Sequence, residues 1–418
     1  MIRRQALVVV AAGLASTARA QAPRVSSSAP HTLCEYTVDF GHSIVEFSIP
    51  FAFSRVKGRF TSAKGTILYD EANPANSSVT MVIEAKSIDT GWPHRDEHLR
   101  TDDFFDVDRY PTIVFQSDRL TRNGDGWLAN GQLTMHGVTR PVAIPFRFPR
   151  PPSRSPESGW MVLNADGAMR LRRADFEILG GSKHNSWFNT ARAATMGDSV
   201  DVSLEIEGYS PDAASQRPAS VEAALERVRT NGVQSQIDRL REAKRTRPAE
   251  TLPGLISGAD LVTRGLIASG RVADAVSLSS AFAELFPTET RAAAVHALAL
   301  AISGDAGGAT REFARMKQVF RAPVVDPNER FPQDDETWYY LDQLARTTIE
   351  WGYAARGVAL ARTIAELYPG TARAHTTLGV LLAETGNAKG AAAAYARALE
   401  VDGRETRALE WRRRLVGA

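Results

Sequence analysis

Apolar and polar residues alternate along much of the segment 33–209. In 44–49, for example, Val45, Phe47 and Ile49 are separated by polar neighbours. A period of two is typical of an antiparallel sheet with one face in a core, and the whole set predicts about eight or nine strands. Further alternations lie at 79–85, 113–115, 133–135, 142–148, 161–165 and 200–206.

Turn residues separate these segments. The sequence Asn-Gly-Asp-Gly at 123–126 predicts a hairpin loop, and Pro74, Asn76 and Ser77 separate another pair of strands. The proline-rich segment 149–156 is expected to be a loop, because proline cannot donate to a strand ladder. Consecutive hairpins in one domain indicate a sandwich or an up-and-down barrel, and a barrel of about eight strands has room inside for one apolar ligand.

The alternating segments predict a stripe of apolar side chains that faces the interior of the sheet. The stripe has two interpretations, a filled core or the lining of an apolar channel, and both use the same residue types. Its members are Val45, Phe47, Phe60, Met81, Ile83, Phe115, Met135 and Phe146.

The segment 87–111 concentrates charge, histidine and aromatic residues between two strand patterns. His94, Glu97 and His98 match H-x-x-E-H, in which two histidines hold zinc and the glutamate activates water. This pattern makes a zinc-dependent hydrolase one alternative function. A catalytic zinc normally has three protein ligands, however, and no third ligand follows at a recognised spacing. Prolines at 93 and 111 leave space for about two helical turns, which favours a short helical connection across one end of a barrel.

In that interpretation Arg95 and Arg100 pair with the aspartates at 96, 102 or 103 and fix the connection. Arginine makes forked hydrogen bonds to phosphate oxygens, so Arg95 and His98 are also candidates for contact with a ligand head group. The apolar residues expected to cover the end of the barrel are Leu99, Phe104 and Phe105.

Several short motifs follow one another through 36–209. They are Asp39-x-x-His42-Ser43-x-x-x-Phe47, Val56-x-Gly58-Arg59-Phe60, Ser87-Ile88-Asp89-Thr90-Gly91, Arg95-Asp96-x-His98-Leu99-Arg100, Tyr110-Pro111-Thr112-Ile113 and His136-Gly137-Val138-Thr139. In order and spacing these motifs resemble the YceI family. The resemblance implies an exported, extended lipocalin-like antiparallel barrel that holds a polyisoprenoid or similar amphiphile and has no catalytic machinery. Two departures are Glu177, where the family usually has glycine, and a long polar segment at 179–196.

With this resemblance the interior stripe is expected to line a cavity. The predicted ligand contacts are Val45, Phe47, Phe60, Met81, Ile83, Arg95, His98, Phe104, Phe115, Met135 and Phe146.

The composition changes after Tyr209, where a proline-containing linker precedes alanine-rich helical patterning. Within it a period of 34 residues places Gly270, Gly304, Gly352 and Gly386 at one repeat position. The pattern resembles the tetratricopeptide repeat over 256–405, with an insertion near 322–336. Such stacked helical hairpins usually bind protein segments on a concave surface.

This repeat region supports a second alternative function, in which the protein is an interaction scaffold and its barrel is filled and inert. The basic residues on its helices are expected to form a solvated face. They are Arg311, Arg315, Lys317, Arg412, Arg413 and Arg414.

Composition narrows the function further. The chain has 418 residues and a formal net charge of +2, so charge does not direct it to nucleic acid. Residues 1–20 have the basic, apolar and A-x-A order of an export signal, and no later segment is apolar for long enough to span a membrane. The single cysteine, Cys34, is expected in a strand, and no disulfide can form within the chain.

The sequence as a whole predicts an antiparallel lipocalin-like β-barrel followed by an all-α tetratricopeptide-like solenoid. We expect a signal peptide at 1–20, the barrel at 33–209, a linker and helices at 210–255, repeats at 256–405 and a last helix at 406–418. The expected function is binding of a polyisoprenoid or other long-chain lipid in the periplasm, with a possible protein partner on the repeats. No enzyme activity, metal or cofactor is expected, since nucleophile and nucleotide motifs are absent from the sequence.

Overall fold

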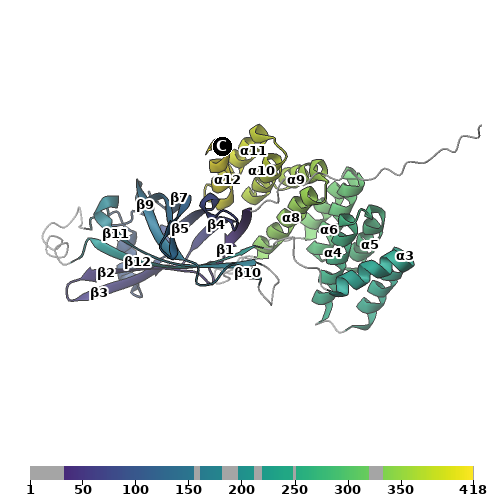
Figure 1. The fold of residues 1–418 in the computed structure, drawn as a ribbon, viewed down its shortest axis with the longest axis horizontal. Coiled ribbons are helices and arrows are strands. Elements are labelled where there is room, and N and C mark those ends of the chain that lie inside the picture. The colour runs from purple at the N-terminus through teal and green to yellow at the C-terminus, as the bar shows by residue number, and fades with distance from the viewer. Residues whose placement is uncertain are drawn as a thin grey trace, which may run out of the picture.

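A computed structural model describes residues 33–154, 161–180, 196–210, 219–247, 251–319 and 333–417. It contains a β-barrel at one end and an array of helices at the other (Figure 1). The predicted fold class, a lipocalin-like antiparallel barrel followed by an all-helical repeat region, is confirmed. The expected signal peptide and most of 179–196 lie outside the described residues.

The barrel is a meander in which strands that follow one another in sequence pair with one another. Eight antiparallel strands close the ring in the order β1-β4-β5-β7-β8-β9-β11-β12, and β12 returns to β1. The strands are β1 (Leu33–Val38), β2 (Ile44–Phe51), β3 (Ser54–Phe60), β4 (Ala63–Asp70), β5 (Ser78–Glu84), β6 (Ile88–Asp89), β7 (Thr112–Asn123), β8 (Gly126–Met135), β9 (Val138–Arg147), β10 (Ser153–Arg154), β11 (Met161–Arg172) and β12 (Ser199–Ser210).

The remaining strands lengthen the wall at one end. Strand β12 pairs first with β1, at Val38 and Gly208, and then with β2, at Val45 and Leu204, so β1 and β2 form one line interrupted at 39–43. Strand β3 continues β4 in the same way, and the β2–β3 hairpin extends the barrel beyond its ring. The segment 149–156 was expected to be a loop, but β10 lies in it and pairs with β11.

Short helical turns connect the strands. The helix α1 (Pro93–Arg100) has the predicted length of two turns and begins at a proline, whose missing N–H is not needed there. Glu177, where the resemblance implies glycine, has φ +58°, in the left-handed region that favours glycine. The 3₁₀ turns in the described part of the barrel are η1 (Pro74–Asn76), η2 (Ala85–Ser87) and η3 (Arg173–Phe176).

The C-terminal region is built of paired helices. In the described residues the pairs are α4–α5, α6–α7, α8–α9 and α10–α11, with α3 before them and α12 after them. No helix in these ranges combines the length and the apolar character needed to cross a bilayer. The helices are α3 (Ala219–Thr246), α4 (Leu252–Ala268), α5 (Val272–Leu285), α6 (Thr290–Ser303), α7 (Ala306–Val319), α8 (Gln333–Glu350), α9 (Ala354–Leu367), α10 (Ala372–Glu384), α11 (Ala388–Val401) and α12 (Thr406–Gly417).

The glycines of the 34-residue period occupy the turn inside each pair. Gly270, Gly304, Gly352 and Gly386 all have φ between +77° and +102°, a conformation that other residues rarely adopt. Most of the predicted insertion at 322–336 lies outside the described residues, and its last residues belong to α8, which begins at Gln333.

Small residues also let the two helices of a pair approach closely. A Cβ atom at Gly379 would overlap the ring of Tyr395, and one at Gly357 would overlap the side chain of Thr348. These positions explain why the repeat alternates small residues with bulky ones.

The last helix returns to the barrel and packs beside β4 and β5 (Figure 1). One barrel residue, Glu35 of β1, is the centre of this contact. Its carboxylate accepts hydrogen bonds from Nη1 of Arg346 at 3.1 Å and Nε1 of Trp411 at 2.9 Å, and it forms an ion pair with Arg407. Arg407 is only 3% exposed and also lies 3.0 Å from Asp342 on α8.

A second buried acid completes the contact. Glu410 is fully buried, and Ser78 and Thr80 of β5 donate to its two carboxylate oxygens at 2.6 and 2.7 Å. Arg414 donates to the Asn76 carbonyl at 2.7 Å, and Arg413 lies 3.8 Å from Asp118. The prediction that these two arginines form a solvated face is therefore wrong, because they lie between the two domains.

The neighbouring arginines keep the Glu35 carboxylate ionised. Burial by itself would raise the pKa of Glu35, but Arg407 and Arg346 outweigh burial and hold the pKa below its ordinary value. A carboxyl with a lowered pKa stabilises the folded state above its unfolded-state pKa, and the contribution is lost as the pH falls through the folded-state value.

We predict that Glu35→Ala lowers the free energy of unfolding by about 3–5 kcal/mol, because it leaves buried arginines without their acid. The matched control is Arg404→Ala, which removes an ion pair with Glu84. That pair is 2.6 Å long, but the Arg404 side chain is 46% exposed. An exposed pair contributes about 1 kcal/mol or less. Denaturant unfolding followed by tryptophan fluorescence measures both variants, and equal losses would contradict a central role for Glu35.

Candidate ligand-binding site

The barrel encloses a cavity of about 870 Å³. Strand side chains with alternating direction form its walls, and nearly all of them are apolar. The volume lies within the range of about 300–1,000 Å³ that is usual for small-molecule pockets. The interior is therefore not filled by its own side chains, which corrects the alternative of a filled barrel.

All of the residues predicted to contact a ligand line this one cavity. The strand residues form the wall, and three residues of the α1 connection stand at one end. They are Val45, Phe47, Phe60, Met81, Ile83, Arg95, His98, Phe104, Phe115, Met135 and Phe146. Their contact with a ligand remains a prediction.

Much of the opposite wall was not among the predicted ligand contacts. The inward positions of β11 and β12 also line the cavity, and they carry the same period-two signal that identified the other strands. These residues are Ala165, Gly167, Met169, Leu171, Val200, Val202, Leu204 and Ile206.

Large buried side chains narrow the end of the barrel near Ser210. Tyr36 and Leu163 are each 1% exposed and pack with Tyr69, whose ring meets that of Phe148 edge to face at 5.3 Å between centroids. Burial raises the pKa of the Tyr36 hydroxyl far above its ordinary value, so Tyr36 stays neutral at this end. The polar lining residues lie mostly at the other end.

The α1 connection forms that other end, which we call the mouth. Arg95 donates from Nε to the Thr90 hydroxyl at 2.7 Å and from Nη2 to the Thr90 carbonyl at 2.8 Å. Asp96 is 5% exposed and accepts from the Thr90 amide at 2.9 Å. Arg100 donates to the Lys86 and Ile88 carbonyls at 2.7 and 3.0 Å.

The partners of the two arginines therefore differ from those expected. Backbone carbonyls and Thr90, rather than the aspartates at 96, 102 or 103, hold Arg95 and Arg100. A carbonyl in a turn leaves no signal in the pattern of charged residues, so the sequence could not identify these partners.

Among the described residues, the histidines of the H-x-x-E-H motif do not converge on a common point with a third ligand. Nε2 of His98 lies 2.9 Å from Asp103, and its ring meets Phe104 edge to face. The ring of His94 instead faces Trp92, 6.1 Å away. Within the described ranges, the one group of three side chains placed to share a cation lies elsewhere, at Asp39, His42 and Glu207.

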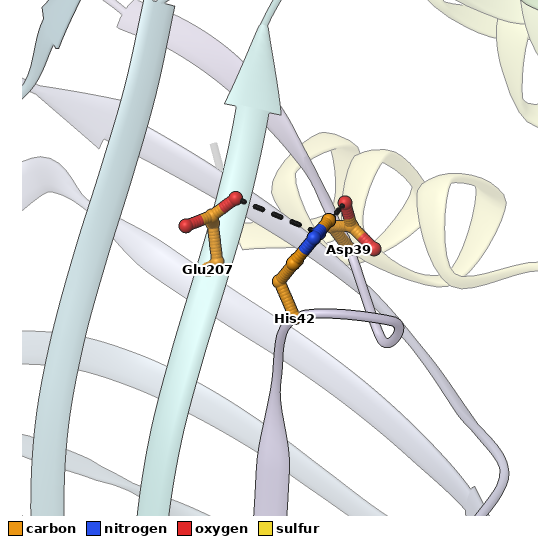
Figure 2. A group of neighbouring side chains, drawn as sticks. All are labelled: Asp39, His42 and Glu207. Atoms are coloured by element: carbon orange, nitrogen blue, oxygen red, sulfur yellow. Dashed lines mark hydrogen bonds and ion pairs between the residues drawn. The ribbon is translucent and has the colours of Figure 1, made fainter.

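This acidic group joins the interruption between β1 and β2 to β12 (Figure 2). Nδ1 of His42 lies 2.8 Å from Asp39 and 3.9 Å from Glu207. The Ser43 hydroxyl donates to the Asp39 carbonyl at 2.6 Å and accepts from the Glu207 amide at 2.9 Å. Backbone and side chains together fix the bend, so the group has a structural role.

The hydrogen bond with Asp39 raises the pKa of His42 above its ordinary value, and the charge of Glu207 adds to the effect. The protonated form is favoured in the folded chain, so this pairing stabilises the fold below about pH 6.5 and is lost as the pH rises through the raised pKa. We predict that Asp39→Asn returns the pKa of His42 towards about 6.5, whereas Glu207→Gln lowers it less. NMR titration of the ring measures both, and a larger effect of Glu207→Gln would contradict the assignment.

The comparisons with known proteins concern the barrel. Residues 36–208 match the family model described as YceI-like domain. A UPF0312 protein of Vibrio campbellii is 33% identical over 183 residues, which are 42% of this chain and 86% of that protein. A UPF0312 protein of Yersinia pestis is 32% identical over 168 residues, 40% of this chain and 81% of that protein.

Solved structures are also similar in part. Burkholderia cenocepacia BcnA has a TM-score of 0.35 and 22% identity, covering 41% of this chain and 98% of its own. A polyisoprenoid binding domain from Saccharophagus degradans has a TM-score of 0.31 and 16% identity, covering 42% of this chain and 98% of its own. With a family model matched along the barrel and relatives covered over most of their length, the chain belongs to the YceI-like family.

Proposed function

We propose that this chain is an exported lipid-binding protein whose barrel holds the apolar chain of a polyisoprenoid or similar amphiphile. One observation carries the proposal: a cavity of about 870 Å³ with an apolar wall and a polar mouth. An amphiphile has the same distribution, a long apolar part with one polar end. Membership of the YceI-like family supports this assignment.

Apolar burial supplies the binding energy. Removing apolar surface from water contributes about 25 cal/mol per Å², or about 0.8 kcal/mol per methylene, before the costs of ordering. Affinity should therefore rise with chain length until the cavity is full. The wall has few polar groups to select among apolar chains, so chain length and head group set the preference.

The mouth is where the head group would lie. His94, Arg95, Glu97 and His98 line it, and Thr90 and Trp92 hold the Arg95 guanidinium on two sides. A fixed guanidinium suits a phosphate or another anionic head group. The proposal requires no catalytic step and no cofactor.

We also propose export to the periplasm, supported by the order of residues 1–20, and a protein-binding role for the repeats. The barrel already covers the side of α8 and α12 that carries Arg346 and Arg407. A protein partner would therefore bind the pairs nearer α4 and α6.

We predict that Ala165→Trp reduces the amount of lipid that copurifies with the protein by at least about tenfold, because the indole occupies the cavity. The matched control is Ala168→Trp, on the same strand but exposed to solvent on the outer face, which should keep its lipid. Native mass spectrometry of protein from the source organism measures both. Equal lipid in the two variants would contradict binding in the cavity.

A second substitution tests the head-group site. Arg95→Gln should weaken binding of dodecyl phosphate about tenfold and leave dodecanol within about twofold, because only the phosphate uses the charge. The control is Arg100→Gln, on the same helix but outside the cavity lining. Fluorescence competition gives both affinities, and parallel losses for the two ligands would indicate a structural role for Arg95.

A further inference from the structure

We propose that the mouth of the barrel docks on the surface of an anionic lipid bilayer, with Phe53, Leu179 and Trp92 inserted between the head groups. The proposal rests on the lipid-binding function above and adds that the cavity exchanges its ligand with a bilayer. Exposed apolar side chains, their position around the mouth and the neighbouring charge support the proposal.

Large exposed apolar side chains that gather at one place on a surface often mark a site of protein or membrane contact. Among the described residues, Phe53 is fully exposed, Leu179 is 62% exposed and Trp92 is 53% exposed. Ile44 is the remaining large apolar residue of this kind, at 42%. It lies on β2, seven residues before the hairpin, or roughly 23 Å away at 3.3 Å per residue.

The three more exposed residues surround one opening. Phe53 is at the turn of the β2–β3 hairpin, and Phe51 beside it pairs with Met196. A Cβ atom at Gly180, the neighbour of Leu179, would lie 2.7 Å from Met196 and 2.8 Å from Phe104. Leu179 and the hairpin therefore lie on the same side of the mouth.

Trp92 joins this group from the α1 connection. It lines the mouth itself, and Gly58 of β3 packs against Thr90 just before it. In Figure 1 the tips of β2 and β3 point away from the helices, so the repeats do not cover this end.

The outer face of β3, next to the hairpin, carries basic side chains. Arg55, Lys57 and Arg59 alternate along β3 and are all exposed, while the residues between them face inward. Arg55 pairs with Asp201 at 2.6 Å and Arg59 lies 3.5 Å from Asp89, so Lys57 is the one of the three with no ion pair to a described acid. Basic side chains beside exposed aromatic and aliphatic residues are the arrangement by which proteins bind the interface of anionic membranes.

The cavity explains why a bilayer is preferred to a protein partner. Buried side chains narrow the far end, so an apolar chain must pass the mouth to enter or leave. A bilayer holds such chains in a continuous apolar phase, and contact with it spares the ligand passage through water. Phe53 itself does not line the cavity, so its exposure has no explanation in ligand binding.

The test is cosedimentation of the full-length protein with vesicles of phosphatidylcholine containing phosphatidylglycerol. Phe53→Ser combined with Leu179→Ser should lower partitioning at least about tenfold, because it removes two inserted side chains. Ile44→Ser is the matched control and should leave partitioning unchanged. Binding should also weaken as salt is added, because the charged face is screened.

A second measurement locates the contact. A fluorescent label at Phe53→Cys, in a chain with Cys34→Ser, should shift to the blue when vesicles are added, whereas a label at Ala168→Cys should not. Equal partitioning of all variants, or an unshifted label at 53, would overturn the proposal. So would loss of a specific protein complex in Phe53→Ser with vesicle binding intact.

Native mass spectrometry separates this proposal from the one on which it rests. The double variant Phe53→Ser with Leu179→Ser and the control Ile44→Ser should both retain lipid in the cavity. Protein that carries lipid but ignores vesicles would overturn bilayer docking alone. Protein that binds vesicles through Phe53 but never carries lipid would overturn the lipid-binding function alone.

Discussion

The buried ion pair between Glu35 and Arg407 is the interaction on which the arrangement of the two domains depends. Burying opposite charges without water is costly unless each is well paired, and here the carboxylate also accepts from Arg346 and Trp411. Such a contact tolerates little displacement. It places α12 against β4 and β5, and the barrel then presents its mouth at the end opposite the helices.

Most of the barrel could be predicted from sequence because its signal is local. A period of two determines which side chains face inward, and Asn123 to Gly126 form the expected hairpin between β7 and β8. The helical repeats are equally local, since each positive-φ glycine marks one turn. The predicted cavity lining follows from the same period, although Ala165 and Leu204 were left out of it while their strands were recognised.

The contacts that could not be predicted join residues far apart in sequence. Arg413 and Arg414 look like any solvated basic run, and only their position beside Asp118 and Asn76 shows that they face the barrel. Arg95 was missed for a different reason, because its partner is nearby in sequence but is Thr90 rather than an acid. A pattern of charges gives the number of partners available but not which of them the fold brings within reach.

The return of the last helix to the first strand also constrains the order in which the protein is completed. Glu35 and Trp411 are 376 positions apart. During synthesis the barrel residues are available long before their partners on α12 exist, since chains fold from the N-terminus as they emerge. The carboxylate of Glu35 therefore stays hydrated until α12 has been made, and docking of α12 follows folding of the barrel.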